Sequence, residues 1–161
     1  MNILITNTFT LLKSIKQNIK SEVLRQLDLK IKDISSAVKS AEESRDNDTK
    51  SSAGDKHETS RAKIQTEIDQ LSKQLINAQR QKNNLSIIDT NTLNSIADVG
   101  SLVETNKGYF FISTGWGRIQ IQDENYYVIS IESPIGRLLK NKKEGDSIQF
   151  RNIAYDILSV S

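Results

Sequence analysis

The chain has no cysteine, one histidine and one proline among its 161 residues. Without cysteine there is no disulfide framework, no thiolate nucleophile and no zinc site with cysteine ligands, which fits a reducing cytoplasm. The single histidine, His57, has no second histidine with which to form a zinc site or a catalytic triad. No apolar run approaches the roughly 20 residues that span a bilayer. We therefore expect a cytoplasmic protein that does not bind a membrane.

Neither sign of charge dominates the chain as a whole. It carries 22 basic and 20 acidic residues, a net charge of +2, which makes no case for a protein that coats nucleic acid or a membrane surface. The acidic residues are nevertheless unevenly spread, because residues 42–60 hold six acids and only three bases. The acidic excess is thus concentrated in the middle of the N-terminal half.

Apolar residues recur three and four positions apart in two separate stretches, as on one face of an α-helix. The two seams are Leu24, Leu27, Ile31, Ile34, Val38 and Ala41, and Ile64, Ile68, Leu71, Leu75, Ala78 and Leu85. In an antiparallel pair the numbers of facing residues add up to a constant. Ala41 with Ile64 gives 105, and Val38 with Ile68 gives 106. We therefore predict an antiparallel coiled-coil hairpin over residues 1–85, which leaves little reason for an intermolecular coil and favours a monomer.

The same register places the tip of the hairpin near residues 48–60. Gly54 is the only glycine among the first 99 residues, and glycine suits a chain reversal because it reaches positive φ without a Cβ penalty. With a rise of ~1.5 Å per residue, the helix from Leu24 to the apex is roughly 45 Å long. A rod this narrow points to a role at its far end.

Beyond the second seam the texture of the sequence changes. Residues 86–98 read as an irregular linker, and residues 99–161 as a β-rich domain in which β-branched and aromatic residues alternate with turn signals. The predicted strands cover 102–104, 109–113, 118–122, 126–132, 147–151 and 154–160, and a short helix is predicted at 134–140. The fold class predicted from these patterns is α+β.

Two acidic residues at the tip, Asp55 and Glu58, are three positions apart. On a helix this spacing puts both carboxylates on one face, where they suit a Mg²⁺ ion that keeps several waters. The same spacing is typical of a capping box at the start of a helix, and spacing alone favours that reading. Both interpretations stay open on this evidence.

The aromatic residues Trp116, Tyr109, Tyr126 and Tyr127 are a second group with functional potential. A stacking surface for nucleic acid needs basic side chains between the rings, and no such stripe is present, so core packing is favoured. A short basic run at 140–143 is explained by a solvated turn. The sequence contains neither a phosphate-binding glycine loop nor a nucleophile elbow.

Several stretches together carry a family resemblance. Residues 133–146 read Ser-Pro-Ile-Gly-Arg-Leu-Leu-Lys-Asn-Lys-Lys-Glu-Gly-Asp. They lie between an Ile-Ser-Ile-Glu segment at 129–132 and a final strand at 154–160. Residues 54–59 read Gly-Asp-Lys-His-Glu-Thr, and residues 87–89 read Ile-Ile-Asp. These resemble the C-terminal signature, the Gly-Asp-x-x-Glu-Asn tip and the interdomain link of the Gre family of bacterial transcript-cleavage factors, GreA and GreB. The likeness covers nearly the whole chain from about residue 20.

The resemblance implies a coiled-coil hairpin joined to an FKBP-like domain at 99–161 that docks on RNA polymerase, with Ser133, Pro134, Ile135 and Arg137 in the docking segment. The hairpin would enter the secondary channel of the polymerase. Asp55 and Glu58 would help to hold a Mg²⁺ ion shared with the polymerase, which then cleaves backtracked nascent RNA in its own active site. Such a transcription elongation factor is not itself an enzyme and has no cofactor of its own.

The tip departs from the family pattern after Glu58, where the family usually continues Asn-Ala-Glu-Tyr and this chain has Thr59-Ser60-Arg61-Ala62. That departure favours an alternative, a Gre-like regulator or inhibitor that occupies the secondary channel without cleavage. An FKBP-like prolyl isomerase or chaperone module and a purely structural coiled coil are the remaining hypotheses, and both fit the sequence less well.

Overall fold

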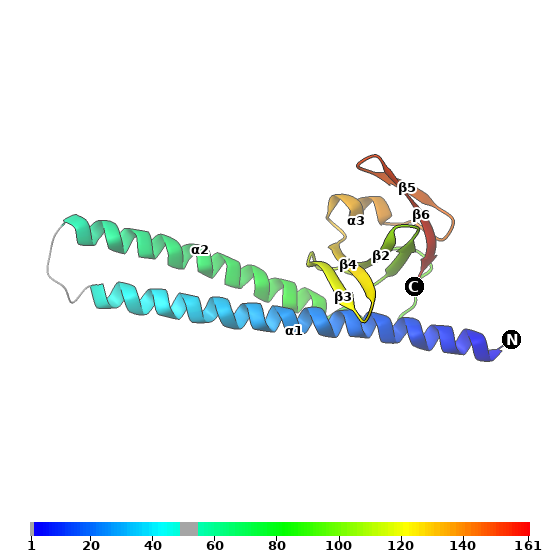
Figure 1. Ribbon diagram of the computed structural model, residues 1–161, viewed down its shortest axis with the longest axis horizontal. Coiled ribbons are helices and arrows are strands. Elements are labelled where there is room, and N and C mark those ends of the chain that lie inside the picture. The colour runs from blue at the N-terminus through cyan, green and yellow to red at the C-terminus, as the bar shows by residue number, and fades with distance from the viewer. Residues whose placement is uncertain (1, 49–54) are drawn as a thin grey trace. The chain divides into compact units, whose positions relative to one another are not determined.

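The computed structural model describes the backbone of residues 2–48 and 55–161 and the side chains of residues 10–47 and 58–161. Its class is α+β, as predicted: a long N-terminal helical region is followed by a mixed sheet of six strands (Figure 1). The helices of that region are α1 (Asn2–Asp48) and α2 (Asp55–Ser86). No helix within the described residues is long and apolar enough to cross a membrane.

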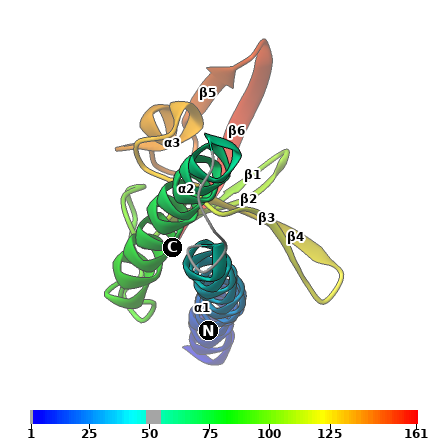
Figure 2. The same cartoon turned by 90° about the vertical axis from the view of Figure 1, so that its left-hand side faces the viewer.

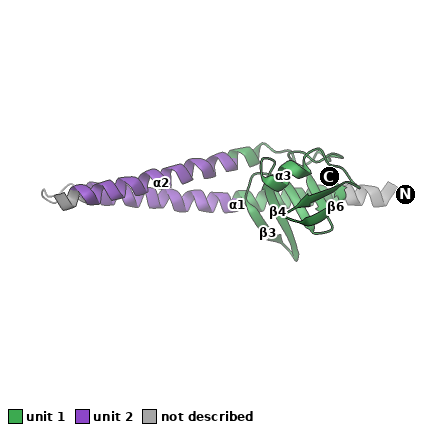
Figure 3. Ribbon diagram, turned by 90° about the horizontal axis from the view of Figure 1, so that it is seen from above, with its two compact units in different colours: residues 1–24, 83–161 green, residues 25–82 purple. Residues whose placement is uncertain are grey.

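Contacts divide the chain into two compact units, coloured separately in Figure 3. Unit 1 contains residues 1–24 and 83–161, and unit 2 contains residues 25–82. Helix α1 is therefore one continuous helix with different partners along its length. It begins at Asn2, well before the predicted seam at Leu24, and its residues up to Leu24 belong to unit 1.

In unit 2 the two helices lie side by side and run in opposite directions (Figure 1, Figure 2). The seam residues Leu27, Ile34 and Ala41 of α1 and Ile68 and Ala78 of α2 are all buried. Burial of such a stripe is what stabilises helices that would be marginal alone.

Two polar contacts cross between these helices, from Lys82 Nζ to Asp28 Oδ1 at 2.6 Å and from Arg45 Nη1 to Gln65 Oε1 at 2.9 Å. In each pair the residue numbers add up to 110, against 105 or 106 for the predicted apolar pairs. The difference corresponds to an axial offset of ~7 Å, which the long side chains of Arg45 and Lys82 span.

The sheet of unit 1 has the strand order β3-β4-β2-β1-β6-β5. Its elements are β1 (Leu102–Thr105), β2 (Gly108–Ser113), β3 (Gly117–Ile121), β4 (Glu124–Ser130), α3 (Pro134–Leu139), β5 (Ser147–Phe150) and β6 (Ile153–Val160). Strands β2 and β4 are parallel, and the other neighbours are antiparallel. Every predicted strand and the short helix are present, with ends that differ by at most two residues.

Both faces of the sheet are buried. On one face Val103, Phe110, Ile112 and Ile157 form a cluster with Leu139 of α3. On the other face Leu102, Phe111 and Val128 are at most 3% exposed. Strand residues alternate between the two faces of a sheet, so the side chains on this second face must be shielded from water by another element. Ile19 and Val23 of α1 are completely buried, and the part of α1 that belongs to unit 1 lies on the side of the sheet away from α3 (Figure 1).

One turn of α1 also holds the chain segment that follows α2. Lys20 Nζ donates hydrogen bonds to the carbonyl oxygens of Ser86 and Ile88, at 2.8 and 2.7 Å. Lys16 Nζ donates to the carbonyl oxygen of Thr92 at 2.7 Å. Residues 87–101 contain no helix or strand, so these carbonyls have no ladder partners, and the lysines satisfy them instead.

Candidate functional site

The two carboxylates singled out by the sequence lie at the start of α2. The helix begins at Asp55, so Asp55 and Glu58 are within its first turn, ~4.5 Å apart along the axis. The Glu58 side chain is exposed. The side chains of Asp55 and His57, and all of residues 49–54 including Gly54, lie outside the described residues.

Asp55 and Glu58 by themselves are too few ligands for a Mg²⁺ ion. Carboxylate oxygens are the ligands that Mg²⁺ prefers, but an octahedral ion needs more oxygens than two side chains supply. Among the side chains that the structure describes, no three His, Cys, Asp or Glu residues gather into a metal-binding group. Two carboxylates three residues apart could supply only part of the coordination of such an ion.

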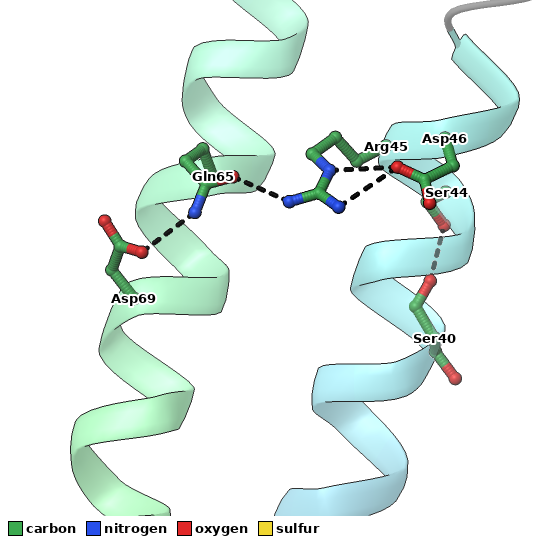
Figure 4. Close-up of polar contacts among 6 residues, drawn as sticks. All are labelled: Ser40, Ser44, Arg45, Asp46, Gln65 and Asp69. Atoms are coloured by element: carbon green, nitrogen blue, oxygen red, sulfur yellow. Dashed lines mark hydrogen bonds and ion pairs between the residues drawn. The ribbon is translucent and has the colours of Figure 1, made fainter.

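A chain of polar contacts joins the two helices close to the end of α1 (Figure 4). The guanidinium of Arg45 contacts Asp46 Oδ1 through two nitrogens, each at 3.1 Å, and donates to Gln65 Oε1 on α2. Gln65 Nε2 in turn donates to Asp69 Oδ1 at 2.9 Å. Sequence reasoning missed Arg45, although it occupies the seam position four residues after Ala41.

The predicted docking segment forms the N-terminal turn of α3. Ser133 is the N-cap, because its Oγ accepts a hydrogen bond from the Gly136 amide at 3.1 Å and donates to the Ser130 carbonyl at 2.7 Å. Pro134 occupies the first turn, where its missing N–H costs nothing. The turn at 131–133 ends β4 at Ser130, two residues before the predicted end, because Ser133 N donates to Ser130 O.

Gly136 explains why this turn packs so closely on β4. A Cβ at this position would lie 2.2 Å from the Ser130 carbonyl oxygen, a separation that no side chain tolerates. Ile135 is half-buried against the core, whereas Pro134 and Arg137 are exposed. Arg137 makes an exposed ion pair with Glu132 at 3.3 Å. The segment thus combines residues that build the turn with residues that are exposed on the surface.

A groove of about 550 Å³ lies within unit 1 beside this turn. Its apolar lining comes from Ile87, Ile88, Val99 and Ile131, and its acidic rim from Asp89 and Glu132. Ile87 is 85% exposed, which is unusual for a residue of its size. Exposed apolar side chains gathered in a groove with a polar rim are typical of a protein-interaction site.

Asp89, on the acidic rim, is held in the charged form. Asp89 Oδ2 accepts a hydrogen bond from the Thr92 hydroxyl at 2.6 Å, and Oδ1 accepts one from the Asn91 amide at 2.9 Å. These hydrogen bonds, the one from Thr92 foremost, lower the pKa of the Asp89 carboxyl below its ordinary value. Asp89 therefore stays negative wherever the protein is studied near neutral pH.

The aromatic side chains pack mainly against one another. Tyr126 is buried and lies 5.3 Å from Tyr109 between ring centroids, and Phe110 stacks on Tyr127 at the same distance. Burial raises the pKa of both the Tyr109 and Tyr126 hydroxyls. These contacts favour the core role predicted for this group over a stacking surface.

Comparison with models of protein families, with curated proteins and with solved structures finds no match.

Proposed function

We propose that the chain is a Gre-like transcription elongation factor, which binds RNA polymerase and stimulates cleavage of backtracked transcripts through Asp55 and Glu58. In this proposal unit 2 is an antiparallel coiled-coil hairpin that enters the secondary channel, and residues 99–161 are an FKBP-like docking domain. The observation that carries the proposal is the start of α2 at Asp55. It puts two carboxylates on the first turn of a helix of 32 residues.

The part of this chain in the reaction is to deliver and orient oxygen ligands. Asp55 and Glu58 would hold a Mg²⁺ ion jointly with the polymerase, and that ion would supply the Lewis acidity that activates the attacking water. The helix backbone sets the spacing of Asp55 and Glu58, and the Arg45–Gln65 hydrogen bond holds the two helices together nearby. Catalytic groups gain most when rigid elements support them, which favours a helix start over a flexible loop.

The groove beside α3 supports the docking half of the proposal. It adjoins the segment with Ser133 and Pro134, and its apolar lining suits a protruding apolar side chain of the polymerase. The exposed carboxylates of Asp89 and Glu132 suit basic residues next to that side chain. The chain then acts as a monomeric accessory that meets nascent RNA only indirectly, in the active site of the polymerase.

The sequence after Glu58 favours a second candidate, a regulator that occupies the channel without cleavage. Arg61 follows Glu58 by three positions on α2 and is exposed, one helical turn away. A guanidinium at that spacing attracts the carboxylate and competes with a metal ion for it. Arg61→Ala should raise cleavage if this competition limits activity.

A stalled elongation complex with labelled RNA tests the proposal. We expect the wild-type chain to shorten the transcript, and Asp55→Ala or Glu58→Ala to reduce the cleavage rate at least tenfold without weakening polymerase binding. Glu67→Ala, which removes an exposed acid further along α2, is the matched control. Equal cleavage by wild type and Asp55→Ala would disprove the metal role. Inhibition of initiation without cleavage at any Mg²⁺ concentration would establish the second candidate.

A further inference from the structure

The groove in unit 1 owes part of its lining to a segment with no regular structure. Ile87, Ile88, Asp89 and Thr92 all line the groove, and all lie in residues 87–101, where the described chain has neither helix nor strand. A segment of this kind orders only at a cost of roughly 1–2 kcal/mol per residue in backbone entropy. Something outside the segment must therefore hold it in one conformation.

Lys20 provides this restraint on both sides of the most exposed groove residue. Its ammonium bonds the carbonyl oxygens of Ser86 and Ile88, the two neighbours of Ile87. The backbone on either side of Ile87 is thus tied to α1, while the Ile87 side chain itself is 85% exposed. An exposed side chain on a fixed backbone is preorganised for a partner, because less entropy is lost on binding.

Lys16, one turn earlier on α1, restrains the same segment a few residues further along, at Thr92. Its side chain is completely buried, and its ammonium bonds the Thr92 carbonyl at 2.7 Å. Between the two lysines, Gln17 Oε1 accepts a hydrogen bond from the Thr90 hydroxyl at 2.7 Å. One helical turn therefore contacts the segment at residues 86, 88, 90 and 92.

Burying the Lys16 ammonium costs desolvation free energy. An apolar side chain of similar length would cover the sheet without the desolvation penalty that a lysine incurs. The cost is offset where the ammonium makes a charge-assisted hydrogen bond, and here it bonds the Thr92 carbonyl of the groove segment. The lysines thus have a task that packing alone does not explain.

We propose that Lys16 and Lys20 are positioning residues for the docking groove: they hold residues 86–92 so that Ile87 and Asp89 are presented to the partner. This inference rests on the proposed function for the identity of the partner, but the restraint itself is a property of the isolated chain. Neither lysine touches the partner in this proposal.

The test uses the full chain with Lys20→Met or Lys16→Met, which keep the length of the side chain and remove the donor. Amide hydrogen exchange of peptides covering 87–92 is measured first. Affinity for core RNA polymerase is measured second. We expect Lys20→Met to speed exchange in 87–92 roughly tenfold, as for the loss of a charge-assisted hydrogen bond, and to weaken polymerase binding by a similar factor. Exchange in β1 to β6 should not change.

Two further variants separate positioning from charge and from general stability. Lys13→Met removes an exposed charge one turn before Lys16 on the same helix, so it reproduces the change in charge and should alter neither measurement. Lys20→Arg keeps a donor and should restore most of the protection. If Lys16→Met does not fold, the half-buried Lys20 still carries the test.

The outcomes separate this inference from the proposed function. Unchanged exchange in Lys20→Met would overturn the positioning role. Faster exchange with undiminished polymerase affinity would overturn the link between the lysines and docking. Faster exchange in a protein whose wild type does not bind polymerase would support the restraint and disprove the proposed function.

Discussion

The two units of this protein bury their apolar side chains to different extents. In unit 2 several seam residues are only half-buried, among them Ile31, Val38 and Leu71. In unit 1 the central strand β2 contains Phe111 and Ile112, which are completely buried on opposite faces of the sheet. Two helices that cover each other on one stripe cannot exclude water as a sheet does when it is covered on both faces. We therefore expect unit 1 to carry most of the stability and unit 2 to open more readily.

The largest effect should come from removing the centre of the sheet. Phe111→Ala deletes a completely buried ring, and we expect it to lower the free energy of unfolding by about 3–5 kcal/mol. Ile153→Ala, at a position that is 46% exposed, is the control and should cost far less. Denaturant titration measures both, and equal effects would contradict the burial of Phe111.

The close approach of α3 to β4 should be the next most sensitive feature. Gly136→Ala places a methyl group against the Ser130 carbonyl oxygen, so we expect a loss of about 3 kcal/mol as α3 shifts. At Gly115 a Cβ would make only an ordinary contact, 3.8 Å from the Ser130 Cβ, and Gly115→Ala should be nearly neutral. Thermal unfolding compares the pair. A neutral Gly136→Ala would mean that α3 is not packed as described.

The buried lysine gives unit 1 a pH dependence of its own. Burial lowers the pKa of Lys16 from 10.5 to about 8, partly opposed by Asp89, so between these values the unfolded chain binds more protons at this site than the folded one. The free energy of unfolding should therefore rise with pH across this window, on the order of 1–2 kcal/mol. The free energy of unfolding of wild type and of Lys16→Met is measured between pH 7.5 and pH 10. The contribution of Lys16 is the amount by which the rise in wild type exceeds the rise in Lys16→Met. Parallel pH profiles would rule it out.

Two tyrosines should limit the pH range over which the free energy of unfolding rises. Because burial raises the pKa of Tyr109 and Tyr126, the folded chain keeps their protons after the unfolded chain has lost them. Stability from these groups is present below the ordinary tyrosine pKa of ~10 and is lost as the pH rises further. The comparison with Lys16→Met removes this shared loss, since both proteins contain both tyrosines.

The smallest effect concerns the polar contact between the helices of unit 2. A double-mutant cycle on Arg45→Ala and Gln65→Ala should give a coupling energy of about 0.5–1 kcal/mol, because the Arg45 side chain is half-buried. The Lys39–Glu43 pair at 3.9 Å within α1 is more exposed and should couple less. A larger coupling for the more exposed pair would refute the bridging role of Arg45.

Several features of the fold were predictable because they depend on neighbours in sequence. The seam of Leu27, Ile34 and Ala41 repeats with the period of a helix, and the strands of unit 1 are bounded by turn residues such as Asn106 and Gly108. The short helix at 134–139 follows from Ser133 and Pro134, whose cap and first-turn roles are local. Each of these signals is complete within about ten residues.

The groove and its supports were not predictable in the same way. The sequence around Lys16 and Lys20 does not mark them as buried or bonded, because their partners lie 66 to 76 residues away. Ile87 read as a linker residue, although it lines a groove that residues of β2 and β4 complete. The parallel pairing of β2 with β4, and hence the strand order, leaves no mark on either strand alone.

By itself, therefore, the sequence determined the two helical seams, the six strands, the short helix and the placement of Asp55 and Glu58 three residues apart. Tertiary structure decided which strands pair, which partner each part of α1 has, and how the lysines of α1 meet the carbonyls of residues 86–92. The physical reason is range: helix periodicity, capping and turns depend on residues close in sequence. Burial of a charge and the shape of a groove depend on residues that only the folded chain brings together.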